Sequence, residues 1–327
     1  MNELKEDEMM MGIRVIVAAV IAAALLFTGV GNYFYNFAIR RSKKEFLEKN
    51  TDLADLPGKP WKDRSEWMEA QSYETLHMTS KDGIQLTGYY LAAPEPTNNL
   101  VILVHGYTGK GKDMACFAEL YREQFGYHVL MPDLRGHGES GGNYIGFGWH
   151  DRRDVLRWID LMLERHGSQV KIVLHGVSMG GGTVLMTSGE SLPDQVKCIV
   201  SDCAYSSVKD ILSYQLKQMF KLPAFPLIHV TSLICKLRAN YFFGEASAID
   251  QVKKTKKPVL FIHGGKDDFV PTFMIYPLYA ACNSEKRMFL VPDAGHGNAY
   301  WTDVEGYTEQ VQAFVRKYVQ LQGPMNA

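Results

Sequence analysis

Residues 171–182 read KIVLHGVSMGGG, and this stretch decides the fold. Its apolar start predicts a buried strand, and the segment after Ser178 predicts a helix that begins near Met179. Gly176 and Gly180 flank the serine in a Gly-x-Ser-x-Gly pattern, whose sharp turn leaves no room for flanking side chains. Such a turn lifts the serine hydroxyl beside a helix N-terminus, where negative charge is favoured. We therefore predict that Ser178 is a nucleophile.

Short apolar runs alternate with helix-like segments on both sides of this stretch. The expected strands are Tyr73–Thr79, Ile84–Leu91, Leu100–Val104, His128–Met131, Lys171–Leu174, Lys197–Val200, Val259–Ile262 and Met288–Val291. The expected helices are Asp113–Gln124, Arg152–Arg165, Gly180–Thr187, Thr272–Cys282 and Val304–Val319. Strands rich in Val, Ile and Leu that alternate with helices predict an α/β fold, a parallel sheet covered on both faces.

One long segment interrupts the alternation, between residues 205 and 250. It is rich in Met, Phe and Leu, and it is too long for an ordinary connection. We expect it to form a helical cap over the sheet, inserted between two parts of one core, residues 73–204 and 251–327.

A serine hydroxyl needs a base to remove its proton, and a carboxylate to orient that base. His296, in the sequence PDAGHG after the last expected strand, is the candidate base because its flanking glycines let the loop reach across the sheet. Two neighbouring carboxylates, Asp267 and Asp268, follow the strand before it, and either could orient the imidazole.

The tetrahedral intermediate of acyl transfer also needs hydrogen-bond donors for its oxyanion. The backbone N–H of Met179, directly after the nucleophile, is the first candidate. The second donor should come from the loop after the strand Leu100–Val104, which reads HGYTG, and we assign it to the N–H of Tyr107.

The N-terminal region predicts a membrane anchor. After a short tail, residues 1–14, the segment 15–39 supplies the roughly 20 mostly apolar residues that a spanning helix needs. Tyr33 and Tyr35 would then lie near the lipid headgroups. A cleaved signal peptide would have a shorter apolar core and a small-residue cleavage site before polar sequence, so an uncleaved anchor is the better interpretation.

Residues 40–72 are charged, are broken by Pro57, Gly58 and Pro60, and predict a juxtamembrane connector. Four basic residues follow the helix at once (Arg40, Arg41, Lys43 and Lys44), whereas only Lys5 and Arg14 precede it. The positive-inside rule therefore favours a cytoplasmic catalytic domain in a single-pass protein of the cell membrane. Anchors that export the following domain also exist, so both orientations stay open.

The composition limits the remaining classes of function. The 327 residues carry a formal net charge of -1 and no basic stripe, so we expect no nucleic-acid partner. The five cysteines have no Cys-x-x-Cys pair, which argues against a disulfide framework and against a zinc site.

The quoted residues resemble the α/β-hydrolase superfamily, and within it the serine-aminopeptidase-like and monoacylglycerol-lipase-like hydrolases. The resemblance extends from about Tyr73 to Val319. The motifs that carry it are His105-Gly106, residues 133–140 (DLRGHGES), the turn around Ser178, Asp267-x-x-Val270-Pro271 and Gly295-His296, and the order Ser, Asp, His is that of the superfamily. It implies an eight-stranded, mostly parallel sheet with a cap after the sixth strand. It also implies acyl transfer to water with no metal and no organic cofactor. It also favours Asp267 over Asp268, and it makes His137 a residue of a loop near the site.

From these residues we expect a membrane-anchored serine hydrolase that cleaves carboxylic esters of small-molecule or acyl substrates through an acyl-enzyme. A serine aminopeptidase or a thioesterase would use the same three residues. A non-catalytic binding protein on a hydrolase scaffold is a further alternative, because fold does not fix function.

Overall fold

The computed structural model describes residues 2–44, 47 and 66–320, and its centre is one eight-stranded sheet. The strands are β1 (Glu74–Thr79), β2 (Gln85–Leu91), β3 (Asn99–Val104), β4 (His128–Pro132), β5 (Lys171–Val177), β6 (Val196–Asp202), β7 (Val259–Gly264) and β8 (Lys286–Val291). Their order is β1-β2-β4-β3-β5-β6-β7-β8. The β1–β2 and β2–β4 pairs are antiparallel and the other pairs are parallel. The predicted mostly parallel, eight-stranded sheet is confirmed.

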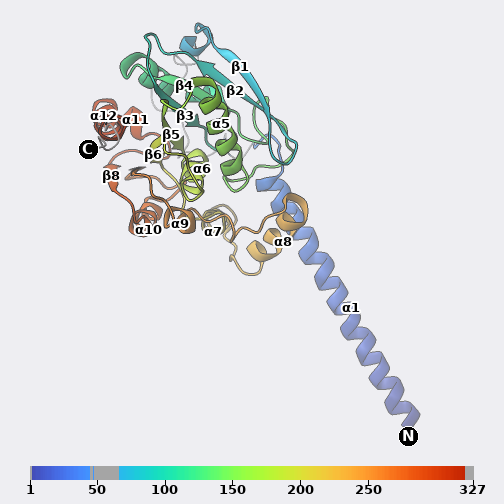
Figure 1. Cartoon of the computed structure of the whole chain (residues 1–327). Coiled ribbons are helices and arrows are strands. Elements are labelled where there is room, and N and C mark those ends of the chain that lie inside the picture. Colours follow the sequence, from blue (N-terminus) through green and yellow to red (C-terminus); the bar gives the residue numbers. More distant parts are fainter. Residues whose placement is uncertain (1, 45–46, 48–65, 321–327) are drawn as a thin grey trace.

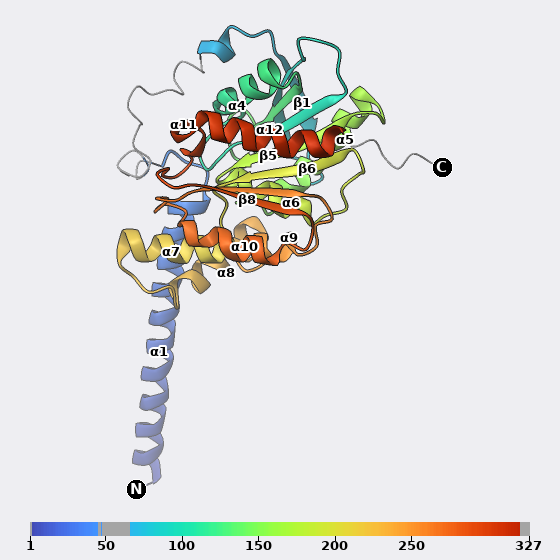
Figure 2. The ribbon, with the colours of Figure 1, turned by 90° about the vertical axis from the view of Figure 1, so that its left-hand side faces the viewer.

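Helices cover both faces of the sheet (Figure 2). One face carries α5 (Asp151–His166), α6 (Met179–Ser188), α9 (Ala248–Val252) and α10 (Ile275–Ala281); the other carries α4 (Ala115–Glu119), η4 (Leu120–Gln124) and α12 (Val304–Gln320). Successive side chains of a strand point to opposite faces. Accordingly, Leu100 and Ile102 of β3 belong to one hydrophobic core, whereas Val101 and Leu103 belong to the other.

The chain between β6 and β7 leaves the sheet and forms α7 (Val208–Phe220) and α8 (Leu227–Ala239) before it reaches α9. The Ser207 hydroxyl accepts a hydrogen bond from the N–H of Asp210 at 3.1 Å, which caps the first turn of α7. Both helices end at residues in the left-handed conformation, Lys221 and Asn240. Helices α7 and α8 lie within the predicted cap, residues 205–250, whereas α9 begins inside it and ends at Val252.

The N-terminal helix α1 (Asn2–Phe34) continues directly into a π-helical turn, η1 (Tyr35–Ile39). Because α1 begins at Asn2, residues of the predicted tail, 1–14, already belong to the helix. The stretch Met9–Ile39 is long and apolar enough to cross a membrane, by length and composition, and its most apolar part is not buried. Figure 1 shows α1 projecting away from the domain, with α8 beside its base.

The end of this helical stretch is built into the folded domain. The N–H of Ile145 donates to the carbonyl of Ile39 at 2.7 Å. The Arg41 guanidinium donates to the backbone carbonyls of Gly138 and Ser140, each at 2.7 Å. Lys44 caps the C-terminal end of the π-helical turn. Its ammonium donates to the carbonyls of residues 36, 37 and 40 at 2.6 to 3.3 Å. The first part of the predicted connector is therefore attached to the domain.

The two tyrosines that were expected near the lipid headgroups differ in their exposure. Tyr35 is only 5% exposed, so protein side chains and not lipid surround its ring. It lies against α8 instead, where the Arg238 guanidinium is 5.2 Å from the centre of the ring. Tyr33, on another side of the helix, remains exposed.

Several predicted segments lie outside the described residues. They are residues 45–46 and 48–65 of the connector and residues 321–327 at the end of the predicted core. Farther along the connector, Met68 is buried against the face of the sheet that carries α12. The five cysteines are free thiols, and all are buried.

Candidate active site

Ser178 lies in a strained turn between β5 and α6. Its backbone has φ 57° and ψ -117°, a conformation that residues with a side chain rarely adopt. A Cβ added to Gly176 would lie 2.1 Å from the carbonyl oxygen of Gly180, and a Cβ added to Gly180 would lie 1.9 Å from that of Val104. Both contacts involve backbone, so these two positions accept only glycine.

The structure brings Ser178, His296 and Asp267 into one hydrogen-bonded chain. The serine Oγ is 2.8 Å from Nε2 of His296, and Nδ1 of His296 is 2.8 Å from Oδ2 of Asp267. An ionised carboxylate can only accept, so Nδ1 carries the proton and Nε2 is free to accept one from the hydroxyl. This arrangement has the geometry of a serine beside its general base.

Asp267 is held in its ionised form. Its Oδ1 accepts hydrogen bonds from the N–H groups of Phe269 at 3.0 Å and Val270 at 2.8 Å. Burial raises the pKa of Asp267, but the charge of His296 and the hydrogen bonds from His263 and His296 outweigh it and lower the pKa to about 2. The carboxylate is therefore available to orient the imidazole and to stabilise its cation.

Asp268 does not take part in this chain. The residue is exposed, and its backbone carbonyl accepts a hydrogen bond from the Tyr214 hydroxyl at 3.1 Å. Of the two carboxylates that the sequence left open, the structure places Asp267 against His296.

The loop after β3 brings a second backbone N–H toward the serine. A Cβ added to Gly106 would lie 3.4 Å from Cβ of Ser178, so the chain passes close to the nucleophile just before Tyr107. The N–H of Met179 begins α6 on the other side of the serine. Neither N–H donates to an acceptor in the described part of the chain. Both are free to donate to a group bound between them.

Two neutral histidines hold this loop in place. The N–H of Leu134 donates to Nε2 of His105 at 3.0 Å, and the N–H of Thr108 donates to Nε2 of His137 at 3.3 Å. Burial lowers the pKa of His105 to about 4 and the pKa of His137 to about 3. The rings lie 4.9 Å apart, and as neutral acceptors they join the loop after β3 to the loop after β4.

An apolar cavity opens beside Ser178. Tyr107, Phe147 and Phe269 line it from the loops of the core, and α7 lines it from the cap. Phe37, at the end of the N-terminal helix, forms part of another wall. Most ligand sites are concave and mainly apolar, with few polar groups, and this cavity is of that kind.

Sequence reasoning missed two contributions to the site. His263 lies at the end of β7, where its Nε2 is 3.2 Å from Oδ2 of Asp267 and 2.8 Å from the carbonyl of Val270. Its position at the carboxyl end of a buried strand was a signal that could have been used. The contact of Phe37 with the cavity had no signal, because aromatic residues at the end of an apolar helix are equally typical of a membrane interface.

A group of potential metal ligands coincides with the same residues. The Cys203 thiol and the donor atoms of Asp267 and His296 lie within 4.8 Å of one another. Burial raises the pKa of Cys203 well above its usual value, so the thiol stays protonated and is a poor ligand. The carboxylate and the imidazole are already bonded to each other. Their chemistry fits a proton relay better than it fits a metal site.

Comparison with known proteins identifies the fold. Residues 99–227 match the family model described as the alpha/beta hydrolase fold. The chain is similar to the uncharacterized protein YqkD of Bacillus subtilis, with 28% identity over 94% of this chain and 97% of that protein. It is also similar to the uncharacterized membrane protein YNL320W of Saccharomyces cerevisiae, with 26% identity over 74% of this chain and 79% of that protein.

Among solved structures, the esterase Pf2001 of Pyrococcus furiosus has a similar fold. It superposes with a TM-score of 0.64 and 22% identity, over 81% of this chain and 97% of that protein. At this identity the likeness concerns the fold alone.

Proposed function

Because this chain is an α/β-hydrolase, we propose that it is a membrane-anchored serine hydrolase that cleaves carboxylic esters. Ser178 is the nucleophile, His296 the general base and Asp267 the residue that orients the base. The observation that carries the proposal is the 2.8 Å contact between the serine Oγ and Nε2 of His296, continued at 2.8 Å to Asp267.

In this mechanism the Ser178 hydroxyl attacks the ester carbonyl carbon while its proton passes to Nε2 of His296. The negative charge that develops on the carbonyl oxygen is stabilised by the N–H groups of Tyr107 and Met179. His296 then donates the proton to the leaving alkoxide, the ester C–O bond breaks, and an acyl-serine remains. Water attacks the acyl-serine, its proton passes to His296 and then to the serine oxygen, and the carboxylic acid leaves.

The lining of the cavity favours an ester over the substrate of an aminopeptidase. An aminopeptidase must hold the positively charged amino terminus of its substrate, for which a carboxylate is the usual partner. Among the described residues that line the cavity beside Ser178, none is charged. An uncharged acyl group suits such a cavity, whereas a buried ammonium would lack a partner.

A fluorophosphonate probe and three substrates test the proposal. Wild-type protein should be labelled and should hydrolyse p-nitrophenyl butyrate, and Ser178→Ala should lose both properties. Ser188→Ala is the matched control, because its hydroxyl lies at the other end of α6 and bonds only the carbonyl of Leu185 at 2.7 Å. Faster cleavage of an amino-acid p-nitroanilide or of a butyryl thioester than of the oxygen ester would contradict the proposed specificity. Folded wild-type protein without any labelling would favour the binding-protein alternative.

We also propose that α1 anchors the protein in the bilayer, with the catalytic domain on the cytoplasmic side. The charge difference across the helix supports this side, because Arg40, Arg41, Lys43 and Lys44 follow it. The protein should stay with membranes in alkaline carbonate, and protease added outside intact protoplasts should leave the domain whole. Digestion of the domain in intact protoplasts would place it on the opposite side.

A further inference from the structure

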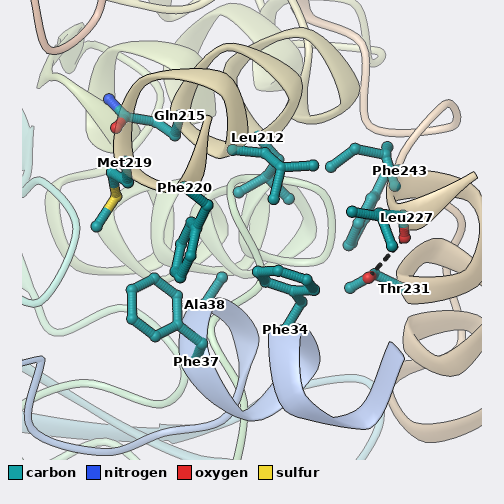
Figure 3. Close-up of a pocket in the computed structure, with 12 residues that line it drawn as sticks. Phe34, Phe37, Ala38, Leu212, Gln215, Met219, Phe220, Leu227, Thr231 and Phe243 are labelled. Carbon is teal, nitrogen blue, oxygen red and sulfur yellow. Dashed lines mark hydrogen bonds between the residues drawn. The ribbon is translucent and has the colours of Figure 1, made fainter. Parts of the chain in front are cut away.

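The cavity beside Ser178 does not end at the nucleophile. A second apolar cavity adjoins it, and the two share five lining residues: Phe37, Ala38, Leu212, Gln215 and Met219. Figure 3 shows this second cavity between the end of the N-terminal helix and the cap helices. Together the two form an elongated apolar space that leads from the serine toward the base of α1.

The N-terminal helical stretch supplies one wall of this space. Phe34 and Phe37 project from it toward Phe220 of α7, with ring centres 5.2 and 5.3 Å from that ring (Figure 3). The Tyr107 hydroxyl donates to the carbonyl of Ala38 at 2.7 Å, which ties this wall to the loop beside the serine. The helix that we propose as a membrane anchor is thus also part of the substrate cavity.

The length of α1 sets the level at which this cavity meets a bilayer. The exposed part of the helix, from Met9 to Gly29, extends about 30 Å at 1.5 Å per residue, and Arg14 near its start can extend its charged end to the interface. This is the thickness of the hydrocarbon core of a bilayer. Gly31 is already buried against α8. The cap therefore begins where the hydrocarbon ends.

The surface of the cap beside α1 suits that level. Phe225 and Leu237 are each 74% exposed, and Leu233, one turn before Leu237 on α8, is 50% exposed. Leu233 and Leu237 are neighbours on α8, while Phe225 precedes the start of the same helix, and exposed apolar side chains of this size mark a surface that contacts another apolar phase. Here that phase is the membrane, because the same surface adjoins a helix long and apolar enough to cross one.

Building on the proposed esterase function, we propose that the joined cavities bind the acyl chain of a long-chain lipid ester, which enters from the bilayer along α1. The chain lies between Phe34 and Phe37 of the helix and the apolar side of α7, and its ester carbonyl lies at Ser178. The chemistry is the hydrolysis described above, with a long-chain fatty acid and an alcohol as products.

Two glycines of α1 offer a matched test of the helix wall. A Cβ added to Gly31 would lie 2.8 Å from Cγ1 of Val230 and 3.0 Å from Cγ1 of Ile234, whereas a Cβ added to Gly29 would have nothing within 4 Å. Leucine at position 31 therefore requires α1 to move off α8, while leucine at position 29 does not. Full-length protein in phosphatidylcholine vesicles would be assayed with p-nitrophenyl palmitate in the bilayer and with p-nitrophenyl acetate in water.

We expect Gly31→Leu to lower the rate on palmitate about tenfold or more and the rate on acetate less than twofold, and Gly29→Leu to change neither. Equal palmitate rates in the two variants, or equal losses on palmitate and acetate in Gly31→Leu, would overturn the proposal.

Met219→Trp keeps the proposal testable if Gly31→Leu does not fold. Met219 lines both cavities and is 38% exposed, so a larger ring can narrow their junction without filling a closed core. This variant should shorten the longest acyl chain that is hydrolysed, and an unchanged chain-length profile would refute the acyl site. Wild-type protein that hydrolyses short esters without any preference for long chains would refute this inference and leave the esterase intact. Absence of all ester hydrolysis would instead refute the esterase function on which the inference rests.

Discussion

Replacement of Asp267 by asparagine would keep the shape of the side chain but would place a hydrogen-bond donor where the carboxylate now accepts from His296. Oδ1 of Asp267 accepts two backbone N–H groups, at 3.0 and 2.8 Å, so the amide oxygen should take that position. The amide NH₂ then faces Nδ1 of His296, where the carboxylate accepts a hydrogen bond at 2.8 Å. Two donors cannot share one hydrogen bond, so the imidazole must carry its proton on Nε2 instead.

In that tautomer Nε2 of His296 cannot accept the proton of Ser178, and the developing imidazolium also loses its counter-charge. The same change of tautomer in another serine hydrolase lowers kcat by about 10⁴, which corresponds to about 5 kcal/mol of barrier. We expect a loss of this size for Asp267→Asn in the hydrolysis of p-nitrophenyl butyrate. Near-UV circular dichroism and the midpoint of urea unfolding would establish that the variant is folded.

Asp268→Asn is the control, because this neighbouring carboxylate is exposed and lies outside the hydrogen-bonded chain. Its kcat should stay within about twofold of wild type. A folded Asp267→Asn protein that keeps more than a tenth of the wild-type kcat would refute the assigned role of Asp267. If kcat fell as much in Asp268→Asn as in Asp267→Asn, the assignment of Asp267 rather than Asp268 as the partner of His296 would be refuted.

Two further predictions concern folding and pH. Gly180→Ala should give little folded protein, because the added Cβ would lie 1.9 Å from the carbonyl oxygen of Val104. Gly244→Ala should fold normally, because its Cβ would have nothing within 4 Å. The soluble yields and the urea unfolding midpoints of the two variants check this prediction. Burial raises the pKa of Asp151 to about 7. Between about pH 4 and pH 7 the folded protein therefore keeps a proton on Asp151 that the unfolded chain has released. The free energy of unfolding should consequently decrease as the pH rises through this range. In Asp151→Asn this decrease in the unfolding free energy should be smaller than in the wild type, and the difference should be on the order of 4 kcal/mol. Urea titrations that give the same pH profile for the variant and the wild type would contradict the raised pKa.

The sheet could be predicted from the sequence because each central strand is buried on both faces. Such strands read as continuous apolar runs, and β5 and β7 begin within one residue of their predicted positions. The turn at Ser178 was equally predictable, because backbone contacts at Gly176 and Gly180 exclude every other residue. Local sequence signals features of this kind through a repeated pattern or a short motif, although the backbone that excludes a side chain at Gly180 is that of the distant Val104.

The contacts of residues 34–39 could not be predicted in the same way. Their aromatic and apolar side chains would suit a headgroup region or a protein interior, and the period of the pattern does not distinguish the two. The choice depends on partners far along the chain: Phe220 for Phe34, Arg238 for Tyr35, and Ile145 for Ile39. One sequence without its relatives holds no record of such distant pairs. His263 is a different case, because it lies only four residues before Asp267 and its position at the end of a strand was a usable signal.

Tyr107 shows why the anchor and the site should be considered as one unit. Its N–H is a proposed oxyanion donor, its ring lies 5.2 Å from that of Phe147 in the wall of the cavity, and its hydroxyl donates to the carbonyl of Ala38. One residue thus connects the reacting atoms, the substrate cavity and the end of the N-terminal helix. A protein shortened to begin at Ser42 would lose the acceptor of the Tyr107 hydroxyl and one apolar wall of both cavities. Assays of the shortened protein would therefore report on a cavity that has lost one wall. The proposed acyl-chain preference has to be measured with the full-length protein, in which the helix is present.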